Sequence, residues 1–293
     1  MLLAQINGCT IHYDVAGKGT PIIFVHPPLL TSENFYYQKK QLSDRFQTIT
    51  FDIRGHGLSS PSKEPLTYQR IVQDMVLILE ELHIKEAHVC GYSAGGTIAL
   101  EALLAFPERF VSGIIVSGMS EMTDWLNRTR VMVAMMFSSL NLKSILSASV
   151  SGTNGDNMVT RHKLHIAAVK GDIKNIYQYY ACCLKYSCTK RLKEIKAPVL
   201  ILYGEKDTRP FHNYAEILHA NLIHSTLHKI EGTGHQIPTK ASLVMNELLR
   251  LWVESIENID NEWQNEHNKR SVPENVEEQF VYDTNDLYER KEE

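Results

Sequence analysis

Apolar and polar positions alternate along the chain in two different periods. Short apolar runs, or apolar residues at every second position, are typical of strands, whereas apolar residues spaced three and four apart predict helices. The predicted strands lie within residues 10–15, 21–25, 47–52, 88–92, 113–118, 197–207 and 225–235. The predicted helices span residues 67–84, 94–106, 212–221 and 240–256. Strands that alternate with helices predict an α/β fold, with a mostly parallel central sheet flanked by helices.

The alternation is interrupted between residues 120 and about 190. This segment has a helical pattern, is rich in Met and Ser, and contains a loop-like stretch at 151–157. We therefore expect one α/β domain over residues 1–257, with a helical cap inserted at about 120–190. Residues 257–293 contain twelve Asp and Glu but four Lys and Arg, a net charge of −8. Residues 258–293 are expected to form an acidic tail that is flexible or loosely docked through its scattered aromatic side chains.

The composition of the whole chain restricts the class of protein. The 293 residues are 43% hydrophobic and 22% charged, which is typical of a soluble globular protein. A net charge of −4 without a basic run argues against a nucleic-acid partner. The first residues lack a signal-peptide pattern and the apolar runs are too short for a bilayer, so we expect a cytoplasmic protein without a membrane partner. Five cysteines without a CxxC spacing favour free thiols, so neither a disulfide framework nor a metal site is expected.

A G-x-S-x-G motif, Gly91-Tyr92-Ser93-Ala94-Gly95, lies between a predicted strand and a predicted helix. A sharp strand-to-helix turn at this place strains the serine backbone and exposes its Oγ atom. Glycines are needed on both sides because side chains there would clash with neighbouring backbone. The N-terminus of the following helix favours developing negative charge. Ser93 is therefore the candidate nucleophile.

A serine hydroxyl is a weak nucleophile until a base removes its proton, and the chain has thirteen histidines. His235 is the candidate base because it follows the last predicted strand, and the carboxyl ends of strands in an open α/β sheet face the ligand crevice. His26 and His56 also lie near strand ends, but a turn-stabilising role suits them better.

The base in turn needs a carboxylate that fixes its tautomer. Asp207 follows the preceding predicted strand, and the order Ser93, Asp207, His235 is the order expected of α/β-hydrolases. Glu121 and Asp124, which follow the strand at 113–118, stay open as alternatives for this role.

These motifs resemble those of the α/β-hydrolase superfamily, in its lidded, esterase- and lipase-like branch. The resemblance covers about residues 10–257 and rests on GYSAGG, FDIRGHGLSS (51–60), PVLILYGEKD and GTGHQIP. It implies that Asp52, Arg54 and His56 are structural. A serine at position 93 argues against dehalogenases and epoxide hydrolases, which look similar but use a carboxylate nucleophile.

The resemblance also explains the HPPLL stretch at residues 26–30. In the family this strand usually ends in His-Gly-x, where the N–H of x donates to the oxyanion. Here Pro27 and Pro28 replace these residues, and proline has no N–H. The N–H of Ala94 is the expected first oxyanion donor and that of Leu29 the expected second. Either the prolines hold the Leu29 N–H inward, which we favour, or the oxyanion hole is weak and turnover is slow.

The predicted cap would cover the crevice and shape the substrate pocket. Its apolar residues either line this pocket or form contacts between the cap helices: Trp125, Met132, Met135, Met136 and Phe137. The sequence predicts a serine hydrolase that cleaves a small carboxylic ester or related acyl compound through an acyl-enzyme, with no cofactor. The alternative is a ligand-binding or signalling protein with little turnover. The reaction subtype and the oligomeric state stay open.

Overall fold

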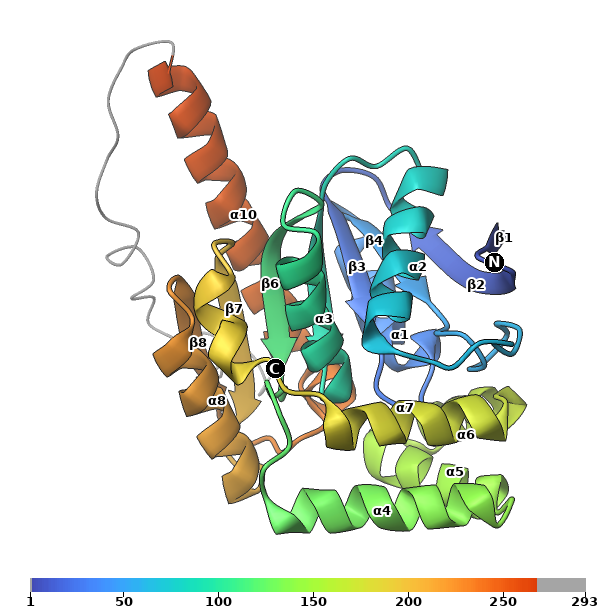
Figure 1. Cartoon of the computed structure of the whole chain (residues 1–293). Coiled ribbons are helices and arrows are strands. Elements are labelled where there is room, and N and C mark those ends of the chain that lie inside the picture. Colours follow the sequence, from blue (N-terminus) through green and yellow to red (C-terminus); the bar gives the residue numbers. More distant parts are fainter. Residues whose placement is uncertain (1, 268–293) are drawn as a thin grey trace. The chain divides into compact units, whose positions relative to one another are not determined.

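The computed structural model describes residues 2–267 (Figure 1). The chain divides into two compact units, one ending at Asn246 and the other beginning at Glu247. The strands are β1 (Leu2–Ile6), β2 (Cys9–Ala16), β3 (Pro21–Val25), β4 (Gln47–Phe51), β5 (Ala87–Tyr92), β6 (Phe110–Val116), β7 (Val199–Gly204) and β8 (Ser225–Ile230). The α-helices are α1 (Tyr36–Leu42), α2 (Tyr68–Glu81), α3 (Ala94–Ala105), α4 (Trp125–Ser139), α5 (Lys143–Asn154), α6 (Met158–Lys170), α7 (Ile173–Lys185), α8 (Arg209–Asn221), α9 (Ile237–Lys240) and α10 (Ser242–His267). Short 3-10 turns lie at Ser32–Phe35 and Thr189–Glu194.

The strands form one eight-stranded sheet in the order β1-β2-β4-β3-β5-β6-β7-β8. The pairs β1–β2 and β2–β4 are antiparallel, and every later pair is parallel. The central strands are buried on both faces, which explains their continuous apolar runs. The predicted fold class, a mostly parallel sheet flanked by helices, is confirmed.

Helices α2 and α3 cover one face of the sheet (Figure 1). Helix α2 begins where the sequence predicts, because the Thr67 side chain accepts a hydrogen bond from the Arg70 N–H. Its apolar face, which includes Ile71, Met75 and Leu79, is fully buried. Helix α3 has buried residues on all sides, since it packs between the sheet and α2.

Four helices, α4 to α7, lie between β6 and β7 in the chain and are called the inserted helices below. Figure 1 shows them together beyond the end of the sheet toward which the parallel strands point. The prediction of a loop at 151–157 is wrong for residues 151–154, because these residues form the last turn of α5. Ser151 and Asn154 are buried there, so tertiary contacts outweigh the low helix propensity of these residues.

Helix α10 continues to His267, beyond the predicted helix end at residue 256. The expected acidic tail lies for the most part in residues 268–293, outside the described residues, and stays a prediction. Within residues 2–267, no helix combines the length and apolarity that crossing a bilayer requires.

Candidate active site

The strand-to-helix turn around Ser93 is fixed by backbone contacts of its glycines. Ser93 has φ 55° and ψ −122°, an uncommon conformation for a residue with a side chain. A Cβ atom on Gly91 would lie 2.2 Å from the Gly95 carbonyl oxygen, and one on Gly95 would lie 2.1 Å from the Val25 carbonyl oxygen. The expected need for glycine at both positions therefore has a direct steric cause. The second contact also presses the start of α3 against the end of β3.

Ser93, His235 and Asp207 are joined by hydrogen bonds. The His235 Nδ1 atom lies 2.8 Å from Asp207 Oδ2, and its Nε2 atom lies 3.0 Å from Ser93 Oγ. Asp207 follows β7 and His235 follows β8, so the carboxyl ends of neighbouring parallel strands bring them together. The Asp207 side chain is 2% exposed and that of His235 is 20% exposed. A carboxylate can only accept, so Nδ1 carries the proton and Nε2 is left free to accept the Ser93 proton.

Two aromatic side chains flank His235. The Phe211 ring centroid lies 4.1 Å from that of His235, and the Tyr92 centroid lies at 5.4 Å. Both rings are buried and restrict the orientations of the imidazole. We did not identify these two residues from the sequence. For Phe211 a signal existed, because it lies in the first turn of the helix that follows Asp207.

The alternative carboxylates have other partners. Glu121 accepts hydrogen bonds from Ser187 and Thr189. Asp124 caps α4 by accepting from the Asn127 N–H at 2.8 Å, and it also accepts from the Tyr214 hydroxyl. Within residues 2–267 neither carboxylate is hydrogen-bonded to His235, so the geometry favours Asp207.

His26 and His56 hold backbone turns, as expected. His26 accepts from the Ile53 N–H at Nε2 and donates from Nδ1 to the Pro27 carbonyl, each at 2.9 Å. His56 donates from Nδ1 to the Arg54 carbonyl at 3.1 Å. Burial lowers the pKa of both rings, that of His56 to about 3, so both are neutral at pH 7.

Asp52 and Arg54 have the structural partners that the family resemblance implies. Arg54 forms a buried ion pair with Asp74. Asp52 accepts from Ser32, from the Leu58 N–H and from His12 Nδ1. Burial alone would raise the Asp52 pKa, but these hydrogen bonds and nearby His26 outweigh it and lower the pKa to about 2.

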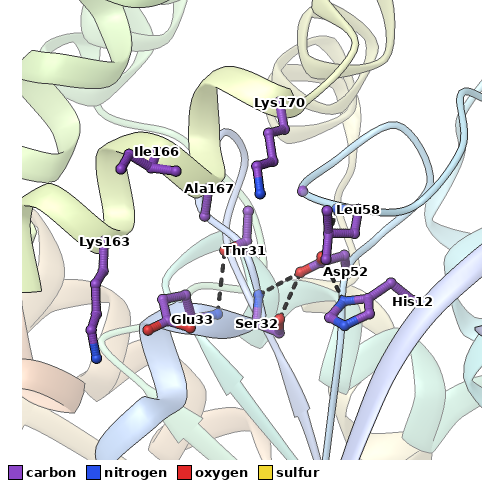
Figure 2. Close-up of a pocket in the computed structure, with 11 residues that line it drawn as sticks. His12, Thr31, Ser32, Glu33, Asp52, Leu58, Lys163, Ile166, Ala167 and Lys170 are labelled. Atoms are coloured by element: carbon purple, nitrogen blue, oxygen red, sulfur yellow. Dashed lines mark hydrogen bonds and ion pairs between the residues drawn. The ribbon is translucent and has the colours of Figure 1, made fainter. Parts of the chain in front are cut away.

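A pocket of about 290 Å³ opens beside Asp52, between α6 and the segments that follow β3 and β4 (Figure 2). Figure 2 shows Lys163 and Lys170 on α6 facing Ser32, Glu33 and Asp52 across it. Its lining does not include Ser93, Asp207 or His235, so it is separate from the candidate nucleophile and base.

Leu29 and Ala94, the expected oxyanion donors, lie on neighbouring segments. The Gly95 contact with Val25 places the end of β3, which leads into residues 26–29, directly against the start of α3. Leu29 has φ 69° and is 1% exposed. Among the described residues no acceptor is hydrogen-bonded to its N–H or to that of Ala94, the first residue of α3. Both amides therefore have free bonding capacity.

The inserted helices present a different apolar face from the one considered above. Trp125, Met132 and Met136 are 76%, 51% and 50% exposed. The prediction that these three side chains line an enclosed apolar pocket is therefore wrong. The buried side chains clustered with Leu29 are Ala134, Ala168, Ile176 and Tyr180, with the partly buried Val131, Met135, Leu146 and Val150 packed against them. The buried residues of α4 are Asn127, Ala134 and Ser138, which have smaller side chains than the exposed tryptophan and methionines of this helix.

Comparison with known proteins agrees with the fold described above. Residues 20–142 match the family model for the alpha/beta hydrolase fold. The uncharacterized hydrolase YugF of Bacillus subtilis is 25% identical over 262 residues, covering 80% of this chain and 90% of that protein. The 3-oxoadipate enol-lactonase 2 of Acinetobacter baylyi is 25% identical over 231 residues, covering 76% of this chain and 85% of that protein. The esterase EaEST of Exiguobacterium antarcticum superposes with a TM-score of 0.79 at 21% identity, covering 86% of this chain and 98% of that chain. The matched family model, the similar proteins and the superposition all support the α/β-hydrolase superfamily for this chain.

Proposed function

We propose that the chain is a serine hydrolase that cleaves small carboxylic esters or related acyl compounds. The observation that carries the proposal is the hydrogen-bond chain from Asp207 through His235 to Ser93. It combines a nucleophile at a strained turn with a base whose tautomer is fixed by a buried carboxylate. The esterase and enol-lactonase among the similar proteins support an ester-type substrate.

In the proposed acylation step, Ser93 Oγ attacks the substrate carbonyl carbon while its proton moves to His235 Nε2. The N–H groups of Ala94 and Leu29 donate to the oxygen that becomes negative, and the N-terminus of α3 adds a favourable dipole. The tetrahedral intermediate then collapses. The alkoxide leaves with the proton from His235, and the acyl group stays on Ser93.

In the proposed deacylation step, His235 removes a proton from water, and the resulting hydroxide attacks the acyl carbonyl. The second tetrahedral intermediate expels Ser93 Oγ, which takes the proton back from His235. Asp207 keeps Nδ1 protonated throughout, and the flanking rings of Phe211 and Tyr92 keep the imidazole in place. The products are a carboxylic acid and an alcohol.

A panel of p-nitrophenyl acyl esters of rising chain length tests the proposal on wild type and Ser93→Ala. We expect hydrolysis by wild type and a loss of kcat on the order of a thousandfold or more in the variant. Ser144→Ala, at an exposed serine of α5, is the matched control and should behave as wild type.

A fluorophosphonate probe separates this function from the ligand-binding alternative. Labelling that depends on Ser93, together with turnover of a short ester, supports a hydrolase. Labelling without turnover of any ester in the panel would favour a binding protein, and hydrolysis that persists in Ser93→Ala would refute the assigned nucleophile.

A further inference from the structure

The loop from His26 to Leu29 has few backbone donors with which to fix itself. Pro27 and Pro28 lack N–H groups, so the anchors of this loop must be carbonyl acceptors and side chains. Inside the loop, His26 Nδ1 donates to the Pro27 carbonyl. From outside, the His26 carbonyl accepts a hydrogen bond of 2.9 Å from the hydroxyl of Tyr179. Tyr179 belongs to α7, so this anchor comes from the inserted helices.

Tyr179 is itself held rigidly. It is fully buried, and its ring packs edge-on against His56 at 5.6 Å and against Tyr68 at 6.0 Å between centroids. Burial, with a smaller effect of nearby Cys183, raises the pKa of the Tyr179 phenol well above its usual value. The hydroxyl therefore remains a proton donor over the working pH range, and the rings around it fix its direction.

The His26 carbonyl, which accepts the hydrogen bond from Tyr179, lies between the segment that contacts the Ser93 turn and the expected oxyanion donor Leu29. Val25, the residue before His26, touches the turn around Ser93 through Gly95. Three residues after His26, Leu29 is kept at φ 69°, in the left-handed region that is strained for a leucine. A strained residue persists only where its surroundings over-determine it. The Tyr179 bond at one end of the loop, and the burial of the Leu29 side chain in the cluster that includes Ile176 at the other, supply that restraint.

We propose that Tyr179 is a positioning residue for the oxyanion hole: by holding the His26 carbonyl, it aims the Leu29 N–H at the oxygen that becomes negative. The inference rests on the proposed hydrolase function. It explains how a loop with two prolines provides a second donor, and it makes α7 part of the catalytic apparatus rather than only a cover for the substrate.

The test compares Tyr179→Phe with Tyr68→Phe, using a short p-nitrophenyl ester. Both variants lose one buried hydroxyl from the same aromatic cluster, but the Tyr68 hydroxyl donates to Cys183 Sγ and not to His26. Rates are expressed per active site titrated with the fluorophosphonate, so that unfolded protein does not count. Affinity for a trifluoromethyl ketone, which forms a tetrahedral adduct, is measured alongside kcat and KM.

We expect Tyr179→Phe to lower kcat about tenfold, less than the hundredfold or more that follows deletion of an oxyanion donor, with little change in KM. Its affinity for the ketone should fall by a similar factor, whereas Tyr68→Phe should match wild type in both measurements. Wild-type kcat and ketone affinity in Tyr179→Phe, or an equal loss in Tyr68→Phe, would overturn the inference. Ser93→Ala, compared at equal concentration of folded protein because the probe cannot titrate it, reports separately on the proposed function: hydrolysis by that variant would refute the nucleophile and not the role of Tyr179.

Discussion

The hydroxyl of Tyr92 donates a hydrogen bond of 3.0 Å to Oδ1 of Asn154, which joins the residue before Ser93 to the last residue of α5. The Asn154 carbonyl also accepts from the Thr239 hydroxyl, in the helix that follows His235. One asparagine of the inserted helices thus contacts the segments that carry both the nucleophile and the base.

Asn154→Ala should lower the free energy of unfolding by about 1–3 kcal/mol, because the buried Tyr92 hydroxyl loses its acceptor. Urea unfolding measures the effect. Asn221→Ala is the matched control, since this exposed asparagine donates to the Ile217 carbonyl within its own helix. It should change stability by less than about 0.5 kcal/mol. Equal losses in the two variants would mean that the link through Asn154 adds nothing.

Asp207→Asn should fold normally and lower kcat for ester hydrolysis by about a thousandfold or more. An amide can present its N–H to His235 Nδ1, which would then act as the acceptor, and Nε2 would carry a proton and no longer accept one from Ser93. Steady-state kinetics measures the loss. Asp124→Asn is the control that tests the alternative carboxylate, and the assignment fails if this variant loses more activity than Asp207→Asn.

Gly95→Ala should destabilise the fold by several kcal/mol, because the new methyl group would meet the Val25 carbonyl, which cannot move without shifting β3. Gly152→Ala gives the opposite expectation. A Cβ there meets nothing within 4 Å, and the position is inside α5, so stability should rise by about 0.5–1 kcal/mol. Denaturant midpoints of the two variants give the comparison, and a change of the same sign in both would contradict it.

The buried His56 should make the fold sensitive to acid. Burial, and then the neighbouring His26, lower the His56 pKa from 6.5 to about 3. The folded state therefore binds fewer protons than the unfolded state between these values, and stability that is complete above pH 6.5 is lost as the pH falls toward 3. This group alone contributes on the order of 4 kcal/mol over that range.

His56→Asn keeps an N–H donor for the Arg54 carbonyl but removes the titrating ring. Its free energy of unfolding should fall less steeply between pH 6.5 and 3 than that of wild type. His83→Asn, at an exposed histidine, serves as the control and should keep the wild-type slope. Equal slopes in all three proteins would show that His56 is not held neutral.

Much of the fold could be predicted because the apolar residues of the core segments clearly follow the period of a strand or of a helix. Strand β3 has the predicted bounds, and α2 begins within one residue of the predicted start at residue 67. Strand β1 was missed because LLAQI is too short to show a period before its pairing with β2 is known. Helix α1, YYQKKQL, was missed because it has almost no apolar stripe.

The candidate site was predictable where chemistry fixes the order of residues along the chain. Ser93, Asp207 and His235 each follow a strand, and the structure brings the three within hydrogen-bond distance. Tyr179 could not be found in this way, because its contact with His26 spans 153 positions and belongs to no motif. Contacts of this kind depend on how α7 packs, which periodicity does not report.

The contact between Gly95 and Val25 affects how the substrate specificity of this fold can change during evolution. It sets the spacing between the nucleophile and the opposing loop by main-chain atoms alone, without any side chain. Substitutions at Val131, Met135 or Val150 can therefore change the apolar surroundings of Leu29 while that spacing stays constant. Selection for a new substrate can therefore change these apolar residues without altering the position of Ser93 relative to the loop after β3.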